Sequence, residues 1–236
     1  MIAMISFIIP AHNEEALIGR TLTSLHESAR KLREEYEIIV VNDASTDRTG
    51  AIALEHGARV VDVDNRQIAA TRNAGAAAAS GEVFIFVDAD TVINPRVLRA
   101  ALRALRRGAA GGGCTIRTDG RLPLYGAMLV CAVRVMQPII GMAGGCFLFC
   151  TRGSYLASGG FDASMYAAEE VDFGARLKRQ GRFVILRDCV ITSGRKLRAH
   201  SALDLLRIGI RFAREGQQAL RRREGLEFWY GPRGIK

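Results

Sequence analysis

The sequence predicts an α/β fold with a mostly parallel central sheet and helices on both of its faces. Four strand-then-helix units follow one another in the first half of the chain, and such alternation is typical of a parallel sheet. The strands at 38–41 and 84–87 are apolar at every position, as expected for strands covered on both sides. The chain has 236 residues, of which 49% are hydrophobic, and it is long enough to bury such a sheet.

The first half divides into four units. Strands are expected at 5–9, 37–41, 59–63 and 83–87, and the helices that follow them at 15–29, 46–56, 67–79 and 95–107. The side chains just past each strand should therefore gather at one edge of the sheet, where ligands bind in folds of this kind.

The second half is less regular. We expect a strand near 113–117, a helix at 123–136, a glycine-rich strand at 144–151, an acidic helix at 168–180, strands at 183–186 and 189–192, and a basic helix at 202–222. With no linker and no repeat, residues 1–236 are predicted to form a single domain, in which 1–110 is one half, 111–200 the other, and 201–236 a basic helix and tail.

The net charge and the cysteine content limit the partners and the compartment that we expect for the chain. The formal net charge is +9, with the excess in the last third, which suits phosphate-rich partners such as nucleotides, lipid phosphates, anionic membranes or nucleic acid. Five cysteines without a CxxC pair give no zinc pattern and favour a reduced compartment. The chain runs directly into an apolar strand, which is interpreted as a core strand and not a signal peptide, and no apolar run reaches the ~18 residues of a membrane span.

Two carboxylates, Asp88 and Asp90, directly follow the buried strand at 83–87, with Ala89 between them. Carboxylates placed in this way suit Mg²⁺ or Mn²⁺, which completes its shell with phosphate and water. Helix capping is the alternative, but Asn94 and Pro95 already supply a cap and a first-turn proline for the next helix.

Two further loops follow strands. Asp43 comes after the second strand, where Ser45 or Thr46 can cap the next helix, so Asp43 is left to accept hydrogen bonds from a base or ribose, or else to stabilise a turn. Asn13 and Glu14 are equally ambiguous, since Asn13 is a candidate helix cap and Glu14 suits a first helical turn.

Three other segments carry candidate groups. Arg72 lies one turn into the third helix, where it could contact a pyrophosphate or simply be exposed. Glu169 and Glu170 follow a glycine-rich loop, and one of them could be a general base or a helix-start acid. Arg195 and Lys196 follow the last strand and could hold a diphosphate or be solvated.

Other motifs are missing. No GxGxxG follows the first strand, no Walker loop is present, and no aromatic and basic interleaving favours nucleic-acid binding. The basic helix has Arg207, Arg211 and Arg214 beside three apolar residues, Leu203, Leu206 and Ile210. Its apolar side could pack on its own domain or on a membrane, and the first is the commoner arrangement.

Taken together, the motifs resemble the family 2 glycosyltransferases of GT-A fold, which have Rossmann-like βα units. The resemblance rests on the segments 8–15 (IIPAHNEE), 39–47 (IVVNDASTD), 72–75 (RNAG), 88–90 (DAD), 159–162 (GGFD) and 169–172 (EEVD), in this order and spacing. It implies a metal-dependent, inverting hexosyltransferase whose first half binds a nucleotide-sugar and whose second half faces the acceptor.

The resemblance also implies roles for individual residues. The donor-binding residues would be Pro10, Ala11, Asn13, Glu14, Asp43, Arg72, Asp88, Ala89, Arg195 and Lys196, with Asp43 at the base and Arg72 bordering base and phosphates. Asp90 would ligate Mg²⁺ or Mn²⁺ together with Asp88, and Glu170 would be the catalytic base. Many relatives supply a histidine where this chain has Thr192 and Ser193.

We therefore expect transfer of a sugar from a nucleotide-diphosphate-sugar, with UDP or GDP favoured, to a hydroxyl of a sugar or lipid-linked acceptor, in glycolipid, polysaccharide or cell-envelope synthesis. A nucleotidyltransferase or a catalytically silent sugar-nucleotide-binding protein is the alternative. The expected location is the cytoplasm, with the basic C-terminal helix available for peripheral contact with the inner face of a membrane; no nucleic-acid partner is expected.

Overall fold

The computed structural model describes residues 4–231, so residues 1–3 and the last five residues of the expected tail lie outside the description. Eight strands form one sheet in the order β3-β2-β1-β4-β7-β6-β8-β5. Their bounds are β1 Ile5–Ala11, β2 Tyr36–Asp43, β3 Arg59–Val63, β4 Val83–Val87, β5 Thr91–Val92, β6 Ala109–Thr118, β7 Phe147–Thr151 and β8 Arg182–Thr192.

The predicted mostly parallel α/β fold is confirmed. Strands β1 to β4 pair in parallel, and so do β6 and β8. Strand β7 joins these two groups by pairing antiparallel with both β4 and β6, and β5 is antiparallel to β8.

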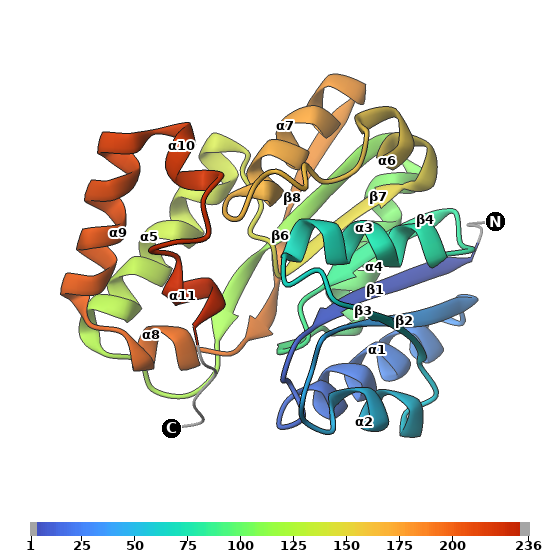
Figure 1. The fold of residues 1–236 in the computed structure, drawn as a ribbon. Coiled ribbons are helices and arrows are strands. Elements are labelled where there is room, and N and C mark those ends of the chain that lie inside the picture. The colour runs from blue at the N-terminus through green and yellow to red at the C-terminus, as the bar shows by residue number, and fades with distance from the viewer. Residues whose placement is uncertain (1–3, 232–236) are drawn as a thin grey trace.

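Helices cover both faces of the sheet (Figure 1). Their bounds are α1 Ile18–Leu32, α2 Thr49–Glu55, α3 Ile68–Ala78, α4 Pro95–Arg106, α5 Leu124–Ile140, α6 Arg152–Ser158, α7 Glu169–Gln180, α8 Arg195–Ala199, α9 Ala202–Glu215, α10 Gln217–Leu220 and α11 Glu227–Tyr230. One core cluster joins α1 and α4 to one face through Leu22 and Leu98, and the other joins α3 and α7 to the opposite face through Ala76 and Phe173.

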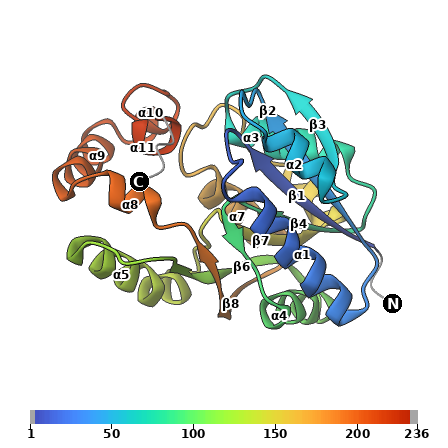
Figure 2. The same ribbon diagram turned by 90° about the horizontal axis from the view of Figure 1, so that it is seen from below.

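The remaining helices stand apart from this layered part. Helices α5, α8, α9, α10 and α11 form a group at one end of the molecule, beyond the carboxyl ends of β1 and β4, in both views (Figures 1 and 2). The side chain of Tyr125 ties α5 to α8, because its hydroxyl donates to the backbone carbonyls of Leu197 and His200. The edge of the sheet that the sequence marks as a binding edge therefore faces this group of helices.

The first two helices begin three residues later than expected, at Ile18 and Thr49. The expected cap residues bond to the neighbouring loop instead of to their own helices: Asn13 Oδ1 accepts from Thr46 N–H, and Ser45 Oγ accepts from Asn13 N–H. Pairing of the two loops across the sheet edge thus replaces local capping. The cap expected at Asn94 is present, since its Oδ1 accepts from the N–H groups of Arg96 and Val97.

Boundaries in the second half also differ. The two strands expected at 183–186 and 189–192 are one continuous strand, β8, whose register against β6 shifts at Cys114 and Thr115. The helix expected at 202–222 ends at Glu215, because Gly216 has a φ of 55° that no longer fits a right-handed helix. Strand β7 begins at Phe147, three residues later than expected.

Helix α3 approaches the sheet closely enough that a glycine is required at position 75. A Cβ there would lie 2.4 Å from Cγ2 of Ile8 and 2.8 Å from Cγ2 of Val41, both in buried strands. Overpacking of a rigid core costs about 1–3 kcal/mol. Gly75→Ala should therefore lower the free energy of unfolding by about that amount in urea denaturation.

The matched control is Gly209→Ala in α9, where an added Cβ meets nothing within 4 Å. Alanine is the better helix former by about 1 kcal/mol, so this variant should be as stable as the wild type or more so. A Gly75→Ala protein with wild-type stability would contradict the close packing of α3 on the sheet.

Candidate functional site

A cavity of about 450 Å³ lies where the carboxyl edge of the sheet meets the group of helices at the end of the molecule. This volume is in the range of small-ligand sites. The lining residues come from both halves of the chain and from the C-terminal segment: Pro10, Ala11, His12, Asn13, Asp43, Ala44, Thr46, Arg66, Gln67, Ile68, Thr71, Arg72, Asp88, Gly145, Tyr166, Glu169, Glu170, Lys196, Arg223, Trp229, Tyr230 and Gly231.

Arg72 is the most buried cation of the site, with 1% of its surface exposed. Its guanidinium donates to Glu169 at 2.7 Å, to Asp88 at 3.0 Å and to the carbonyl of Gly145 at 3.0 Å. The guanidinium carbon also lies 5.3 Å from the ring centroid of Phe161. Burial opposes the charge, but Asp88, Glu169 and Glu170 outweigh it and raise the pKa of Arg72, so the group stays cationic.

Asp90 lies beside a second cation, Arg195. Its Oδ2 is 3.2 Å from Nη2 of Arg195, and its Oδ1 accepts from the hydroxyl of Thr192 at 3.3 Å. Burial and the charge of Asp88 raise the pKa of Asp90, while Lys196 and Arg195 oppose the shift. The effect of Asp88 on this pKa places the two aspartates in one electrostatic site.

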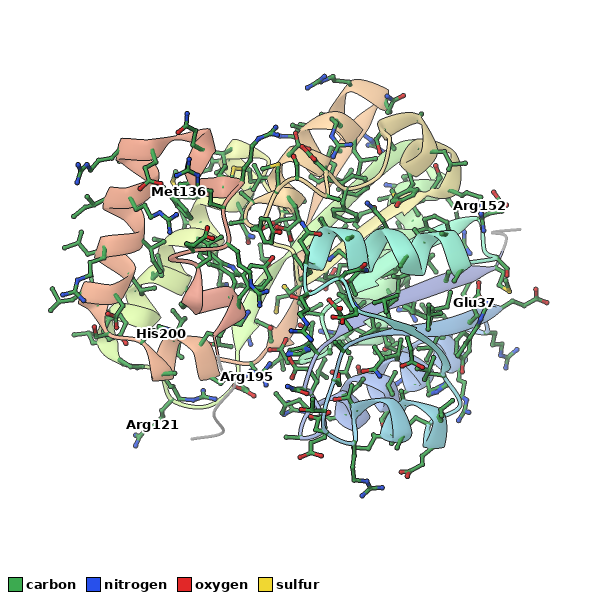
Figure 3. The ribbon with its side chains drawn as sticks, viewed as in Figure 1. Glu37, Arg121, Met136, Arg152, Arg195 and His200 are labelled. Carbon is green, nitrogen blue, oxygen red and sulfur yellow. The ribbon has the colours of Figure 1, made fainter. Side chains whose placement is uncertain are left out.

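Arg195 also bridges to the first loop. Its Nη2 lies 2.5 Å from Oε1 of Glu14, which is buried after β1. Arg195 occupies the junction between the helices and the sheet, whereas Glu37 and Arg152 lie at the opposite end of the strands (Figure 3). Its Nε is buried without a hydrogen-bond partner among residues 4–231, so one donor of this cation is left over for a ligand.

The two glutamates at the start of α7 are placed differently. The carboxylate of Glu169 pairs with Arg72. Glu170 lines the cavity, with its Cδ 3.6 Å from the position of a Cβ on Gly145. Burial, and then the charge of Glu169, raise the pKa of Glu170 to about 8, although Arg72 opposes the shift. A carboxyl group with such a pKa can exchange a proton near neutral pH.

Asp43 is buried at the end of β2 and is less available than the sequence suggests. Its Oδ1 accepts from the backbone N–H groups of Asn65 and Arg66, and its Oδ2 accepts from the hydroxyl of Thr71. The carboxylate therefore holds the loop before α3, as the turn-stabilising interpretation predicts, while it also lines the cavity.

A divalent cation at this edge of the sheet would need carboxylates such as Asp88 and Asp90. Among residues 4–231, no group of three or more His, Cys, Asp or Glu side chains is arranged to hold a metal ion. Mg²⁺ and Mn²⁺ sites that include a diphosphate need only one or two protein carboxylates, and Asp88 with Asp90 can supply these. In this structure the guanidinium of Arg195 pairs with Asp90, so a positive charge already lies beside this carboxylate.

The structure brings most of the expected site residues together. Eight line the cavity: Pro10, Ala11, Asn13, Asp43, Arg72, Asp88, Glu170 and Lys196. Glu14, Asp90 and Arg195 adjoin it through their shared ion pairs, and Ala89 is buried with its carbonyl accepting from Thr21. The expected roles of these residues are not tested by their positions and remain a proposal.

The sequence did not single out the wall made by the C-terminal segment. Arg223, Trp229 and Tyr230 line the cavity, and the Tyr230 hydroxyl donates to the Tyr166 carbonyl at 2.9 Å. The only signal was a run of three aromatic residues, Phe228, Trp229 and Tyr230, in a tail rich in charged residues. Glu169 belongs to the motif at 169–172, but the sequence does not reveal that it pairs with Arg72, because the two residues lie 97 positions apart in the chain.

Comparison with known proteins identifies what the chain resembles. The sequence model described as "Glycosyl transferase family 2" matches residues 6–136. A validoxylamine A glucosyltransferase of Streptomyces hygroscopicus subsp. jinggangensis is 30% identical over 132 residues, which cover 52% of this chain and 31% of that protein.

An undecaprenyl-phosphate 4-deoxy-4-formamido-L-arabinose transferase of Pseudomonas fluorescens is 30% identical over 136 residues, which cover 53% of this chain and 40% of that protein. The chain thus matches less than half the length of either relative. Among solved structures, the mannosyltransferase PcManGT from Pyrobaculum calidifontis, in complex with GDP-Man and Mn²⁺, is 20% identical with a TM-score of 0.70, covering 88% of this chain and 61% of that one. That likeness shows the fold, which is the GT-A type.

The raised pKa of Glu170 predicts a pH-dependent stability. An unfolded Glu170 ionises near its ordinary value of 4.5, whereas the folded protein holds the proton up to about 8. Between these values the unfolded state binds fewer protons, so this residue favours unfolding increasingly as pH rises. Glu170→Gln should therefore gain stability relative to the wild type from pH 5 to 8, as measured by urea denaturation of the ligand-free protein.

Glu27→Gln is the control, because this carboxylate is exposed on α1 and belongs to no ion pair among residues 4–231. Its stability difference from the wild type should not change over the same pH range. A constant difference for Glu170→Gln as well would show that Glu170 is not held protonated.

Proposed function

The chain belongs to glycosyl transferase family 2, and we propose that it is an inverting glycosyltransferase that moves a sugar from a nucleotide-diphosphate-sugar to an acceptor hydroxyl. One observation carries the proposal: a single cavity joins the expected donor-binding residues of the first half to Glu170 of the second half. A transferase needs both sets of groups in one place, because the donor must be held while the acceptor loses a proton.

The donor occupies the sheet edge. Pro10, Ala11 and Asn13 line the cavity beside Asp43 and Arg66, which is the part of the site suited to a nucleoside. Arg195 and Lys196 lie on the side of Asp90, where their cations would face a diphosphate. The unpartnered Nε of Arg195 is the donor group that this anion would satisfy. UDP and GDP are the favoured nucleotides.

A divalent cation, Mg²⁺ or Mn²⁺, is proposed at Asp90 and Asp88. When bound there, it would neutralise charge that builds up on the departing diphosphate. Arg195 lies 3.2 Å from Asp90, so its guanidinium would also be near the diphosphate and would stabilise the charge of the leaving group.

Glu170 is proposed as the catalytic base. It accepts the proton of the acceptor hydroxyl while the hydroxyl oxygen attacks the anomeric carbon from the face opposite the diphosphate, which inverts the configuration. Glu169 has a different task, because its carboxylate is held by Arg72. That ion pair orients the start of α7 and so positions Glu170 at the cavity.

The proposal also includes the acceptor and the cellular setting of the enzyme. The proposed acceptor is a hydroxyl of a sugar or lipid-linked molecule, in glycolipid, polysaccharide or cell-envelope synthesis. One relative named above supports a lipid-linked acceptor, since its name includes undecaprenyl phosphate. A cytoplasmic enzyme at the inner face of a membrane is proposed as its setting. A nucleotidyltransferase would need a glycine-rich, lysine-bearing loop after β1, where this chain has Ala11, His12, Asn13 and Glu14. A silent binding protein would not need the carboxylates that line the cavity.

Glu170→Gln should separate binding from transfer. The amide keeps the size of the side chain but accepts no proton, so transfer should fall by about 100-fold or more while affinity for the donor stays within about threefold. Transfer is followed as release of nucleoside diphosphate from the sugar donor, and affinity by calorimetric titration of that donor. Glu82→Gln, at the other end of β4, should keep both properties. A fully active Glu170→Gln enzyme would remove Glu170 from the base position.

A further inference from the structure

Helix α5 exposes an unusual amount of apolar surface. Its most exposed side chains are Leu124 at 79% and Ile139 at 73%, and Met128 follows at 65%. Further large apolar side chains with more than a third of their surface exposed are Leu129, Val135, Met136 and Ile140. Of its 17 residues, only Gly126 and Gln137 are buried. A patch of this kind marks a surface that another apolar body covers.

Helix α9 belongs to the same group of helices at the end of the molecule (Figures 1 and 2). Its apolar residues Leu203, Leu206 and Ile210 are 63%, 57% and 48% exposed, so the interpretation that they pack on their own domain is wrong. The helix instead contacts the C-terminal segment through Phe212, whose ring centroid lies 6.2 Å from that of Trp229. The apolar face of α9 is therefore presented outward.

Cations accompany both apolar faces. Arg207 and Arg214 are exposed on α9 and follow Leu203 by one and by three turns, so they flank the apolar residues. On α5 the single charged residue is Arg134, which is also exposed. Residues 120–161 contain no Asp or Glu at all. On α9, Asp204 and Glu215 pair with Arg207 and Arg211, whereas Arg214 has no ion pair among residues 4–231. The two helices are thus apolar with an excess of positive charge.

We propose that the exposed faces of α5 and α9 dock the protein on the surface of an anionic lipid bilayer. The apolar side chains would enter the boundary between headgroups and acyl chains, and the arginines would contact lipid phosphates. Among residues 4–231, no helix is long and apolar enough to cross a membrane, so both helices lie along the surface. The excess of positive charge favours lipid phosphates over a second copy of the chain as the occupant, because a symmetric contact would duplicate Arg134 and Arg214, which have no ion pair among residues 4–231.

This docking would also orient the cavity. Tyr125 of α5 bonds to the backbone of α8, and α8 begins at Arg195 and carries Lys196 of the cavity wall. Helix α8 thus connects the two outward faces with the site. An acceptor held in the bilayer would approach the cavity from this side of the molecule.

The test is flotation with vesicles, using the full chain. Wild-type protein should bind vesicles of equimolar phosphatidylglycerol and phosphatidylcholine and should bind vesicles of phosphatidylcholine alone at least tenfold more weakly, with binding reduced by added salt. The double variant Met128→Glu/Ile139→Glu should reduce binding to the anionic vesicles by about tenfold or more, because two charges would enter the apolar boundary. Arg207→Gln/Arg214→Gln should reduce it severalfold.

The matched control is Leu54→Glu/Leu156→Glu. These leucines are 62% and 65% exposed, on α2 and α6, so the control adds the same charge to exposed apolar positions outside the group of end helices. It should bind vesicles within about twofold of the wild type. All the changed positions are exposed, and unchanged thermal unfolding would show that each variant is folded.

Three results would overturn the proposal. The first is absence of binding of the wild type to anionic vesicles, and the second is equal loss of binding in the control and the α5 variant. The third is a wild-type dimer in sedimentation that Met128→Glu/Ile139→Glu converts to a monomer, without vesicle binding, since a second copy would then cover the face. Because every readout is binding or mass, the outcome does not depend on whether the protein transfers sugar.

Discussion

The site depends on one buried cation, Arg72. Its guanidinium is 1% exposed, and removing it from water is costly unless its charge and its donors are satisfied. Asp88 at the end of β4, Glu169 at the start of α7 and the carbonyl of Gly145 before β7 balance the charge and accept hydrogen bonds from the two terminal nitrogens, while Nε has no partner among residues 4–231. Since each partner belongs to a different element, the ion network fixes how the two halves of the sheet meet. The same contacts fix the position of Glu170, because this residue follows Glu169 in the first turn of α7.

A second arginine, Arg195, pairs with two other carboxylates of the site. Arg195 bridges Glu14 and Asp90, so the carboxylates of the site are divided between Arg72, which is 1% exposed, and Arg195, which is 12% exposed. The two arginines differ in how firmly their side chains are held. Arg72 is 1% exposed, has three partners for its terminal nitrogens and lies against an aromatic ring, whereas Arg195 follows a strand end and is 12% exposed. The Nε of each arginine has no hydrogen-bond partner among residues 4–231. A phosphate group would therefore compete for Arg195 more readily than for Arg72.

Much of the fold could be predicted from the sequence because apolar strands and helical periodicity are local signals. Strands β3 and β4 have the expected bounds, and Asn94 caps α4 as its position before Pro95 suggests. The errors lie where tertiary contacts replace local ones: Asn13 and Ser45 bond across two loops, so α1 and α2 start late. In the site, the motifs identified Asp88, Asp90 and Glu170 as candidates. They could not reveal that Asp43 is already hydrogen-bonded to Asn65, or that Trp229 reaches the cavity, since these contacts join distant segments.

The ion network and the cavity support the proposed donor site at the sheet edge, and the outward faces of α5 and α9 lie beyond it. The central claim is that Asp90 supports metal-dependent binding of a nucleoside diphosphate, and thermal unfolding with UDP and GDP, each with and without Mn²⁺, tests it most directly. The correct nucleotide should raise the melting temperature by about 4 °C or more only when Mn²⁺ is present, and Asp90→Ala should abolish that increase. A metal-dependent increase that persists in Asp90→Ala, or no increase with any nucleotide in the wild type, would contradict the claim.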